Sequence, residues 1–292
     1  MTLADIMTNG RAMALPLVFE EFFDQQTPMM QPVGGMDRIA HALYEQVRPA
    51  VRLNSPITAI RRHGAGVRIE HGPGALALEA DHCICALPLT MLQRIPNDFS
   101  AAKQAAIRDI PYLPSVKVGF ESPRFWEDEG IYGGIGWTDQ ANENLLYPSG
   151  NFNSNRGVLV GAYCAGWTGD HLGAFNAMSH AQRFQLCRDV IERMHPGKSH
   201  LLDKPVTIAW GSTPWSEGVG PVGPDFTDTA RGAHYAELLR PEGPIVFAGE
   251  HLSYVLYWQE GAALSAHAAM RVMAEQAAAR APVEAASRSV EA

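Results

Sequence analysis

The sequence lacks the features that mark several classes of protein. No run of 18 apolar residues occurs in its 292 residues, so no segment is long enough to be expected as a membrane-spanning helix. The first residues, MTLADIMTNGRAMALPLVFEEFF, contain no cationic stretch followed by an apolar run, which is the pattern of a secretory signal peptide. We therefore expect a soluble, cytoplasmic protein.

Cysteine is scarce and histidine is scattered. With 4 cysteines in 292 residues the composition excludes a disulfide scaffold, and we expect buried thiols at Cys83, Cys85, Cys164 and Cys187. The 11 histidines show no metal-ligand spacing, and His195 and His200 flank a Pro-Gly turn. We expect no metal site.

Basic residues are outnumbered by acidic ones. Lys and Arg total 23 against 31 Asp and Glu, a formal net charge of -8, and no basic block is long enough to follow a phosphate backbone. Nucleic acid is therefore not expected as a partner. What is present, 46% apolar and 18% charged residues with 27 Gly and 20 Pro, is the composition of an ordinary folded protein. Folding at this length buries roughly 75% of the unfolded surface, which allows one large or two ordinary domains.

The first part of the chain alternates between helix and short strands. Residues 1–30 have the pattern of a helix followed by a polar turn. A two-glycine turn then precedes Asp37, which we expect to N-cap a helix ending at Val47. Short β-type runs at 51–53, 57–60, 67–69 and 76–78 predict a β-meander.

The later runs are more strongly apolar. Residues 82–87 have the pattern of a strand covered on both faces, and a helix restarts at Pro88. Between 114 and 239 we expect strands at 116–120, 145–147, 158–164 and 206–210, with a helix at 179–194. A buried strand at 245–248, an Ala-rich helix from 259 to about 279, and a disordered tail at 281–292 complete the chain. This alternation predicts an α/β fold.

One motif matches a nucleotide-binding pattern in spacing but not in context. Gly218, Gly220 and Gly223 in GVGPVG satisfy G-x-G-x-x-G. That fingerprint needs a preceding strand and a following helix, whereas PWSE precedes it here and Pro221 and Pro224 oppose a helix. We do not expect a phosphate-binding loop at this position.

The strongest local signal is IVFAGEHLSYVLYWQEGAALSAHAAM, residues 245–270. A buried strand that ends in Gly249-Glu250 and leads into a helix places Glu250 at the carboxyl edge of a sheet, where its carboxylate suits a sugar or ribityl hydroxyl. The helix N-terminus near Trp258 and Gln259 presents free N–H groups and can stabilise an anion. The alternative interpretation is a capped helix with solvated carboxylates.

Lys117 is the one charged residue in the strand run Val116–Phe120. Alternation places Val116, Val118 and Phe120 on one face and the lysine on the other. Two interpretations remain open, an edge-strand lysine that faces water and a lysine that points into a cofactor cleft.

Seven segments occur in the order expected of FAD-dependent amine oxidases: VGGMDRIAHAL, CICALPLTML, VKVGF, RFWEDEGIYGG, YPSGNF, GAY and FAGEHLSYVLYWQEGA. The chain most resembles the L-amino acid oxidase branch, from Phe19 to about Met270. The resemblance implies an incomplete FAD-binding domain, Rossmann-like and of the glutathione-reductase type, at 33–112 and 239–280. It further implies a mixed-sheet α+β substrate domain at 113–238, with 1–32 ending a helical region.

The resemblance also implies roles for individual residues, with FAD as the cofactor and an amino acid or amine and O2 as substrates. For the cofactor it implies a backbone contact of Ile57 with adenine, Gly249 and Glu250 near the ribityl chain, Gln259 at the helix N-terminus, and Trp210 beside the flavin. For the substrate it implies Lys117 as the lysine linked through water to flavin N5, Tyr163 as the hydroxyl that holds the carboxylate, and Trp258 as an aromatic wall over the flavin. Tyr257 stands where venom enzymes usually have a glycine, which would reshape the substrate pocket.

The chain also departs from the family pattern. It starts past the strand, glycine-rich loop and helix that hold the FAD pyrophosphate in these enzymes, and past the segment bearing the arginine that pairs with substrate carboxylate. Three interpretations stay open: a split enzyme whose partner chain supplies the G-x-G-x-x-G half, a truncated non-catalytic fragment, and a binding module. A monoamine or polyamine oxidase of the same family is the alternative enzyme.

Overall fold

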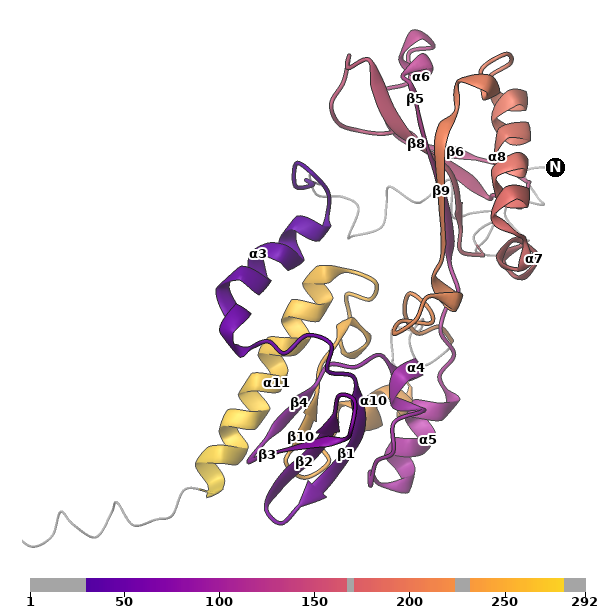
Figure 1. Cartoon of the computed structure of the whole chain (residues 1–292). Coiled ribbons are helices and arrows are strands. Elements are labelled where there is room, and N and C mark those ends of the chain that lie inside the picture. The colour runs from indigo at the N-terminus through magenta and orange to yellow at the C-terminus, as the bar shows by residue number, and fades with distance from the viewer. Residues whose placement is uncertain (1–29, 167–170, 224–231, 281–292) are drawn as a thin grey trace, which may run out of the picture. The chain divides into compact units, whose positions relative to one another are not determined.

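The computed structural model describes residues 30–166, 171–223 and 232–280. The chain forms two compact units, one with Pro114–Thr213 and the residues up to Arg52, the other with Leu53–Leu113 and the residues from Pro214. Figure 1 shows the elements of each unit. The helix expected before Met30 and the tail expected at 281–292 lie outside the described residues.

The first unit is built on a five-stranded sheet with the order β6-β7-β8-β5-β9. All of its pairings are antiparallel. The strands are β5 (Val116–Pro123), β6 (Ile135–Trp137), β7 (Asn144–Leu146), β8 (Arg156–Cys164) and β9 (Asp203–Ala209). Because β5 pairs with β8 on one side and β9 on the other, it is an interior strand.

One face of this sheet is buried and the other is open. Val116, Val118 and Phe120 are at most 1% exposed, as the alternation predicts. They form a core with side chains of the helices α7 (Leu172–Ala177) and α8 (His180–Met194), which therefore cover this face. The open face carries Lys117, which is exposed. The register of β8 shifts opposite Val118, and the extra residue is Gly161, where a Cβ would come within 2.9 Å of the Phe120 ring.

The helix α8 starts where the sequence predicts. Ser179 is its N-cap, and its hydroxyl accepts a hydrogen bond from the Gln182 N–H while the Ser179 N–H donates to the Gln182 side chain. Arg193 lies in the last turn, where a cation suits the negative end of the helix dipole. The unit also contains the short helices α6 (Phe125–Asp128), η4 (Ser199–Leu201) and η5 (Trp210–Ser212).

The second unit contains two small sheets. An antiparallel meander has the order β1-β2-β3, with β1 (Ile57–His63), β2 (Gly66–His71) and β3 (Leu76–Ala80), which confirms the predicted meander. A parallel pair joins β4 (Cys83–Cys85) to β10 (Ile245–Phe247). Because β4 and β10 run parallel, their carboxyl ends lie at one edge of the sheet, and a helix follows each strand.

In the described part of this unit, these sheets are accompanied by the helices α4 (Leu89–Leu92), α5 (Ala101–Asp109), α10 (Ala233–Leu239), η6 (Glu250–Leu252) and α11 (Gln259–Arg280). Side chains of α4, α5 and α10 share one core with β10, in which Ile245 is fully buried. Strands and helices thus alternate around a parallel pair, and the predicted α/β class is confirmed.

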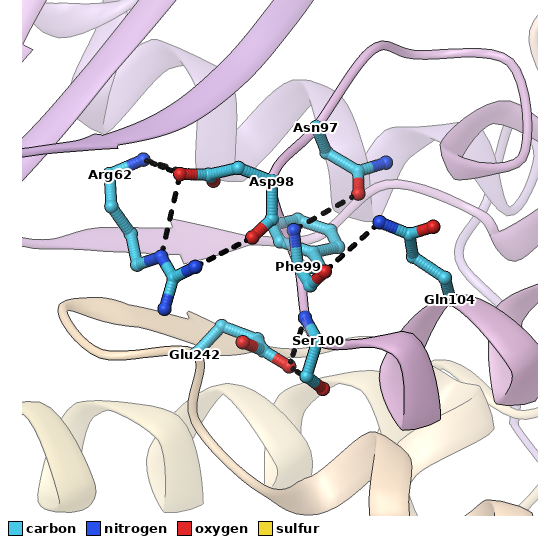
Figure 2. Close-up of polar contacts among 7 residues, drawn as sticks. All are labelled: Arg62, Asn97, Asp98, Phe99, Ser100, Gln104 and Glu242. Atoms are coloured by element: carbon cyan, nitrogen blue, oxygen red, sulfur yellow. Dashed lines mark hydrogen bonds and ion pairs between the residues drawn. The ribbon is translucent and has the colours of Figure 1, made fainter.

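The loop before α5 connects three parts of the second unit (Figure 2). The Asp98 carboxylate accepts from the Arg62 N–H of β1 at 3.1 Å, and the Asp98 carbonyl accepts from the Arg62 guanidinium at 2.7 Å. Ser100 N-caps α5, and its hydroxyl donates to Glu242 at 2.6 Å, in the turn that leads to β10. Phe99 between them packs edge-on against Phe247 of β10. The loop therefore joins the meander, α5 and the parallel pair.

Two local predictions are wrong. The helix α3 (Asp37–Val47) has the predicted span, but its N-cap is Met36 and Asp37 is already its first helical residue. The cause is that the two-glycine turn allows the chain to enter helical geometry one residue early. Residues 51–53 are no strand, because Pro49 directs residues 48–50 into the 3-10 helix η3 (Arg48–Ala50).

The compact units change at 113/114, next to a predicted domain boundary, and at 213/214. The sequence predicts the second boundary at 238/239. In the structure, Tyr235 and Leu238 of α10 already belong to the core that α5 and β10 share in the second unit. The assignment of the units as substrate-binding and FAD-binding domains stays a prediction.

Candidate functional site

Lys117 and Tyr163 are direct neighbours across β5 and β8. They pair in the strand register, and the Lys117 ammonium lies 4.2 Å from the centroid of the Tyr163 ring. An ammonium over an aromatic face is attracted by the ring quadrupole. Since β5 is an interior strand, Lys117 is not on an edge strand, although its side chain is exposed as that interpretation expected. Two residues to which the resemblance assigns roles at the substrate are thus in contact.

The environment of both groups favours their neutral forms. The Lys117 side chain is exposed in part, but the protein packed around its ammonium removes some of its hydration and lowers its pKa, and burial raises the pKa of the half-buried Tyr163 phenol. The lysine is therefore easier to deprotonate than a lysine in water, and the tyrosine stays a hydrogen-bond donor at neutral pH. The pair can offer a hydroxyl and an amine that accepts or releases a proton.

The surface around this pair is apolar. Ile208 of β9 pairs with Lys117 from the other side, and Val206 and Val158 flank Gly119 on the same open face. Val158 and Val206 are 55% and 65% exposed. This face therefore combines Lys117 and Tyr163 at one end, an apolar floor of Val158, Val206 and Ile208, and the ion pairs of Glu121 with Arg156 and Lys204 at the other end.

Trp210 lies at the same end of the sheet. It begins η5 directly after β9. Its backbone N–H donates to the carbonyl of Ser115, the residue two positions before Lys117, at 2.9 Å. The indole is half-buried. The first unit therefore brings together three predicted site residues, Lys117, Tyr163 and Trp210.

In the second unit, Gly249 and Glu250 follow β10 at the carboxyl edge of the parallel pair. Gly249 has φ +145, and a Cβ there would come within 2.3 Å of the His251 ring, so only glycine fits. Its N–H donates to the Ser265 hydroxyl of α11 at 2.8 Å. The Glu250 carboxylate accepts from the Tyr257 N–H at 2.8 Å, and burial raises the pKa of Glu250. The position of Glu250 at this edge is the one predicted from the sequence, whereas its bond to Tyr257 was not predicted.

Tyr257 and the GVGPVG segment pack together. The Tyr257 hydroxyl donates to the Pro221 carbonyl at 2.5 Å, and a Cβ at Gly220 would come within 2.6 Å of the Tyr257 ring. Residues 219 and 220 exchange backbone hydrogen bonds with Leu113. Tyr112 and Tyr257 lie against Gly218 and Gly220, which gives both glycines a packing reason.

The N-terminus of α11 is formed by a close turn. Trp258 is half-buried and Gln259 is the first helical residue, as predicted. Gly261 is required because a Cβ there would overlap the Val255 carbonyl oxygen. Ile57, the remaining predicted residue, is half-buried at the start of β1, opposite His71.

The described residues fit one end of FAD. Glu250 offers a half-buried carboxylate. A Cβ added at Gly220 would lie 3.2 Å from the Glu250 Oε1 atom, so the absence of a side chain at Gly220 leaves the carboxylate accessible. Trp258 adds a flat apolar surface, and the α11 N-terminus adds a positive dipole end. Within the described ranges, no strand, glycine-rich loop and helix follow one another to receive a pyrophosphate. The residues suit the ribityl and ring end.

Other kinds of site find little support. Both ring nitrogens of His195 are engaged, with the Tyr147 hydroxyl at 2.6 Å and a Glu129 carboxylate oxygen at 2.6 Å. In the described part of the chain, no three His, Cys, Asp or Glu side chains gather as metal ligands do. No helix among the described residues has the length and apolar character to cross a membrane. The four cysteines are free thiols, with Cys83 half-buried and the others buried.

Comparison with known proteins gives consistent matches. The family described as flavin containing amine oxidoreductase matches residues 4–273. The flavin-dependent L-tryptophan oxidase RebO of Lentzea aerocolonigenes is 32% identical over 262 residues, 87% of this chain and 55% of the relative. An L-amino-acid oxidase of Siganus canaliculatus is 31% identical over 275 residues, 89% of this chain and 51% of the relative. The chain thus spans about half the length of these curated relatives.

Solved structures with a similar fold are more distant in sequence. Cyclohexylamine oxidase from Brevibacterium oxydans IH-35A superposes with a TM-score of 0.72 at 18% identity, over 84% of this chain and 53% of that one. Putrescine oxidase bound to putrescine gives a TM-score of 0.70 at 22% identity, over 84% and 53%. These likenesses show the fold.

Proposed function

Because the chain belongs to the family of flavin-containing amine oxidoreductases, we propose that it takes part in the FAD-dependent oxidation of an L-amino acid. The overall reaction converts the amino acid, O2 and water to a 2-oxo acid, ammonia and hydrogen peroxide. The observation that carries this proposal is the stacked pair of Lys117 and Tyr163 on the open face of an interior strand pair. The 32% and 31% identity to an L-tryptophan oxidase and an L-amino-acid oxidase supports the choice of an amino acid.

Bound FAD would supply the acceptor for the hydride of the substrate α-carbon and pass the two electrons to O2. Tyr163 donates its hydroxyl to the substrate carboxylate, a role that its raised pKa supports because the phenol keeps its proton. Lys117, with its lowered pKa, holds a water molecule and exchanges a proton with it. That water adds to the imine, which then breaks down to the 2-oxo acid and ammonia.

The residues proposed to hold the cofactor are those of the resemblance. Glu250 and Gly249 would contact the ribityl chain, the backbone of Ile57 the adenine, and Gln259 the flavin at the α11 N-terminus. Trp210 and Trp258 would lie beside the flavin ring, and Tyr257 would narrow the substrate pocket. The half-buried carboxylate beside Gly220 supports this assignment for Glu250.

The pyrophosphate of FAD would be held outside the described residues. We propose a split assembly in which a second chain contributes the strand, the G-x-G-x-x-G loop and the helix. The coverage of 55% and 51% of the relatives' lengths is compatible with such a division. The cytoplasmic location stays a prediction, which fractionation of the source cells would test.

The test is substrate-dependent formation of hydrogen peroxide by the FAD-loaded assembly, purified from its source with any partner chain. L-tryptophan and L-leucine would be compared with tryptamine and isoamylamine, the matching amines without a carboxylate. We expect peroxide from the amino acids, and a large loss of turnover in Lys117→Met but not in Lys204→Met, because Lys204 is an exposed lysine paired with Glu121. Faster turnover of the amines would favour the amine-oxidase alternative. No peroxide with any compound would favour the fragment or binding-module interpretation.

A further inference from the structure

Glu143 is a buried carboxylate for which the proposed reaction has no direct use. It is 0% exposed, although glutamate is almost never fully buried without partners. Its φ of +60 lies in the left-handed region, which costs free energy for a residue other than glycine. Its backbone N–H donates to the Gln140 carbonyl and its carbonyl accepts from the Thr138 N–H, both at 2.8 Å. The residue therefore stands in a closed turn before β7 that holds it in a strained conformation.

The carboxylate of Glu143 accepts from two consecutive backbone N–H groups beyond the end of β8. One oxygen is 2.8 Å from the Ala165 nitrogen and the other is 2.9 Å from the Gly166 nitrogen. Hydrogen bonds to a charged acceptor are roughly twice as strong as neutral ones. These amides come two and three residues after Tyr163, so Glu143 fixes the chain just past the proposed substrate-binding hydroxyl.

Two further bonds hold β8 on both sides of Tyr163. Asn142, in the same turn as Glu143, donates from its side chain to the Gly161 carbonyl at 3.1 Å. The hydroxyl of Ser115, which stands two residues before Lys117, donates to the Cys164 carbonyl at 3.1 Å. The backbone around Tyr163 is therefore fixed by side chains from outside β8, at the end of the sheet where Lys117 stacks on the phenol ring.

We propose that Glu143 is a positioning residue that holds Tyr163, and through it Lys117, in the arrangement the reaction needs; this inference rests on the proposed function. Glu143 itself contacts neither substrate nor cofactor. When one of its two carboxylate oxygens is replaced by an N–H2 group, one of the Ala165 and Gly166 amides loses its acceptor and the end of β8 moves. The Tyr163 ring then leaves the Lys117 ammonium.

The first test needs neither FAD nor substrate. The sequence contains only four lysines, Lys103, Lys117, Lys198 and Lys204, so reductive methylation with 13C-formaldehyde yields a simple NMR spectrum that can be assigned with Lys117→Arg. The Lys117 methyl signal should be shifted upfield by the ring current of Tyr163, 4.2 Å away. In Glu143→Gln this shift should fall to less than about half, because one amide hydrogen then faces an N–H2 group rather than an acceptor.

The matched control is Glu192→Gln. Glu192 also accepts from two backbone N–H groups, those of Gly197 at 2.7 Å and Ser199 at 3.1 Å, in a loop of the same unit. This variant should leave the Lys117 signal unchanged. A Lys117 signal that is also unchanged in folded Glu143→Gln would overturn the proposal, whatever the activity of the protein.

A kinetic test separates positioning from general support of the fold. In the active assembly, Glu143→Gln should raise KM for L-tryptophan about 10-fold or more, as the loss of one charge-assisted hydrogen bond would. KM for tryptamine, which has no carboxylate for Tyr163, should change less than about 2-fold. Equal effects on both would overturn the positioning role, and absence of any oxidase activity would count against the proposed function alone.

If Glu143→Gln does not fold, two other measurements decide. Glu143→Asp keeps the charge but is one methylene shorter and can reach one amide, so its Lys117 signal should lie between those of wild type and unstacked lysines. In the wild-type chain, hydrogen exchange of the Ala165 and Gly166 amides should be slowed at least about 100-fold relative to an unstructured chain. Unprotected exchange at both amides would reject the proposal.

Discussion

At the scale of single residues, the Tyr163 hydroxyl has the most specific expected role. Tyr163→Phe keeps the ring beneath the Lys117 ammonium and removes only the donor. If the hydroxyl holds the substrate carboxylate, the loss of a charge-assisted hydrogen bond weakens binding by about 1.5–3 kcal/mol, or roughly 10- to 150-fold. We expect this increase in Kd or KM for an amino acid and none for the matching decarboxylated amine.

The control for this substitution is Tyr132→Phe, in the same unit. Tyr132 is 56% exposed and its ring contacts Phe152, so the loss of its hydroxyl should affect neither substrate. An equal effect of Tyr163→Phe on the amino acid and the amine, or no effect on either, would rule out the carboxylate role.

A buried lysine of the second unit has a structural role. Lys103 is 0% exposed, its ammonium donates to the carbonyls of Leu238 at 2.9 Å and Arg240 at 2.7 Å, and it lies 4.4 Å from the Phe247 ring centroid. It thereby satisfies carbonyls at the end of α10, which no intrahelical partner reaches. We expect Lys103→Met to lower the free energy of unfolding by about 2–3 kcal/mol, because buried carbonyls lose their donor.

Urea denaturation monitored by circular dichroism measures this change. Arg108→Met on the same helix α5 is the comparison, since Arg108 is 67% exposed and pairs with the adjacent Asp109, a contact worth about 1 kcal/mol at most. If the two variants lost the same small amount of stability, Lys103 would not support α10.

At the scale of elements, α8 depends on its first residue. The capping box of Ser179 and Gln182 satisfies the N–H groups at the start of the helix that covers the five-stranded sheet. Ser179→Ala should cost about 0.5–2 kcal/mol, whereas Ser179→Asp, which also caps, should cost less. Thermal unfolding of the three proteins would show the order. Equal Tm values for wild type and Ser179→Ala would mean that tertiary packing alone sets the start of α8.

The short helix η6 makes the second unit sensitive to acid. His251 is 5% exposed, and burial lowers its pKa from 6.5 to about 4. The unfolded chain therefore binds a proton at a higher pH than the folded protein does. The stability that comes from keeping His251 neutral is complete above pH 6.5 and is lost as the pH falls toward 4, by about 3 kcal/mol.

Denaturant unfolding at pH 7, 6, 5 and 4 checks this dependence. The free energy of unfolding should depend less on pH in His251→Gln than in wild type, because the variant has no imidazole at position 251. It should depend on pH as in wild type in His200→Gln, which changes an exposed histidine. The same slope in all three proteins would assign the acid sensitivity to carboxylates instead.

At the scale of the whole molecule, the described residues predict which part of FAD the chain binds. The residues fit the ribityl and ring end, while the described ranges hold no loop and helix for the pyrophosphate, the most highly charged part of the cofactor. We expect the chain alone to bind FAD more weakly than about 1 μM and to bind riboflavin about equally well. Flavin fluorescence titration with both ligands measures this. Sub-micromolar binding of FAD, with a clear preference over riboflavin, would contradict it.

Local chemistry made much of the architecture predictable from the amino-acid sequence. Alternation placed Val116 and Phe120 on a buried face opposite Lys117, and the helix expected at 179–194 corresponds to α8, because strand and helix periods act over a few residues. The same local reasoning failed at Asp37, where a glycine turn shifted the helix entry. The family resemblance, which the match over residues 4–273 supports, was also determined by the sequence alone.

Contacts between distant segments were decided only by the tertiary structure. No sequence pattern near Lys117 predicts that β5 pairs with a strand on each side. The sequence around Glu143 likewise does not predict that its carboxylate accepts from the backbone amides of Ala165 and Gly166. The parallel pairing of β4 with β10 likewise joins segments from different parts of the chain. Such contacts depend on the register and packing of whole elements, whose free energies are sums over many side chains, whereas a local pattern reports only the face on which each residue lies.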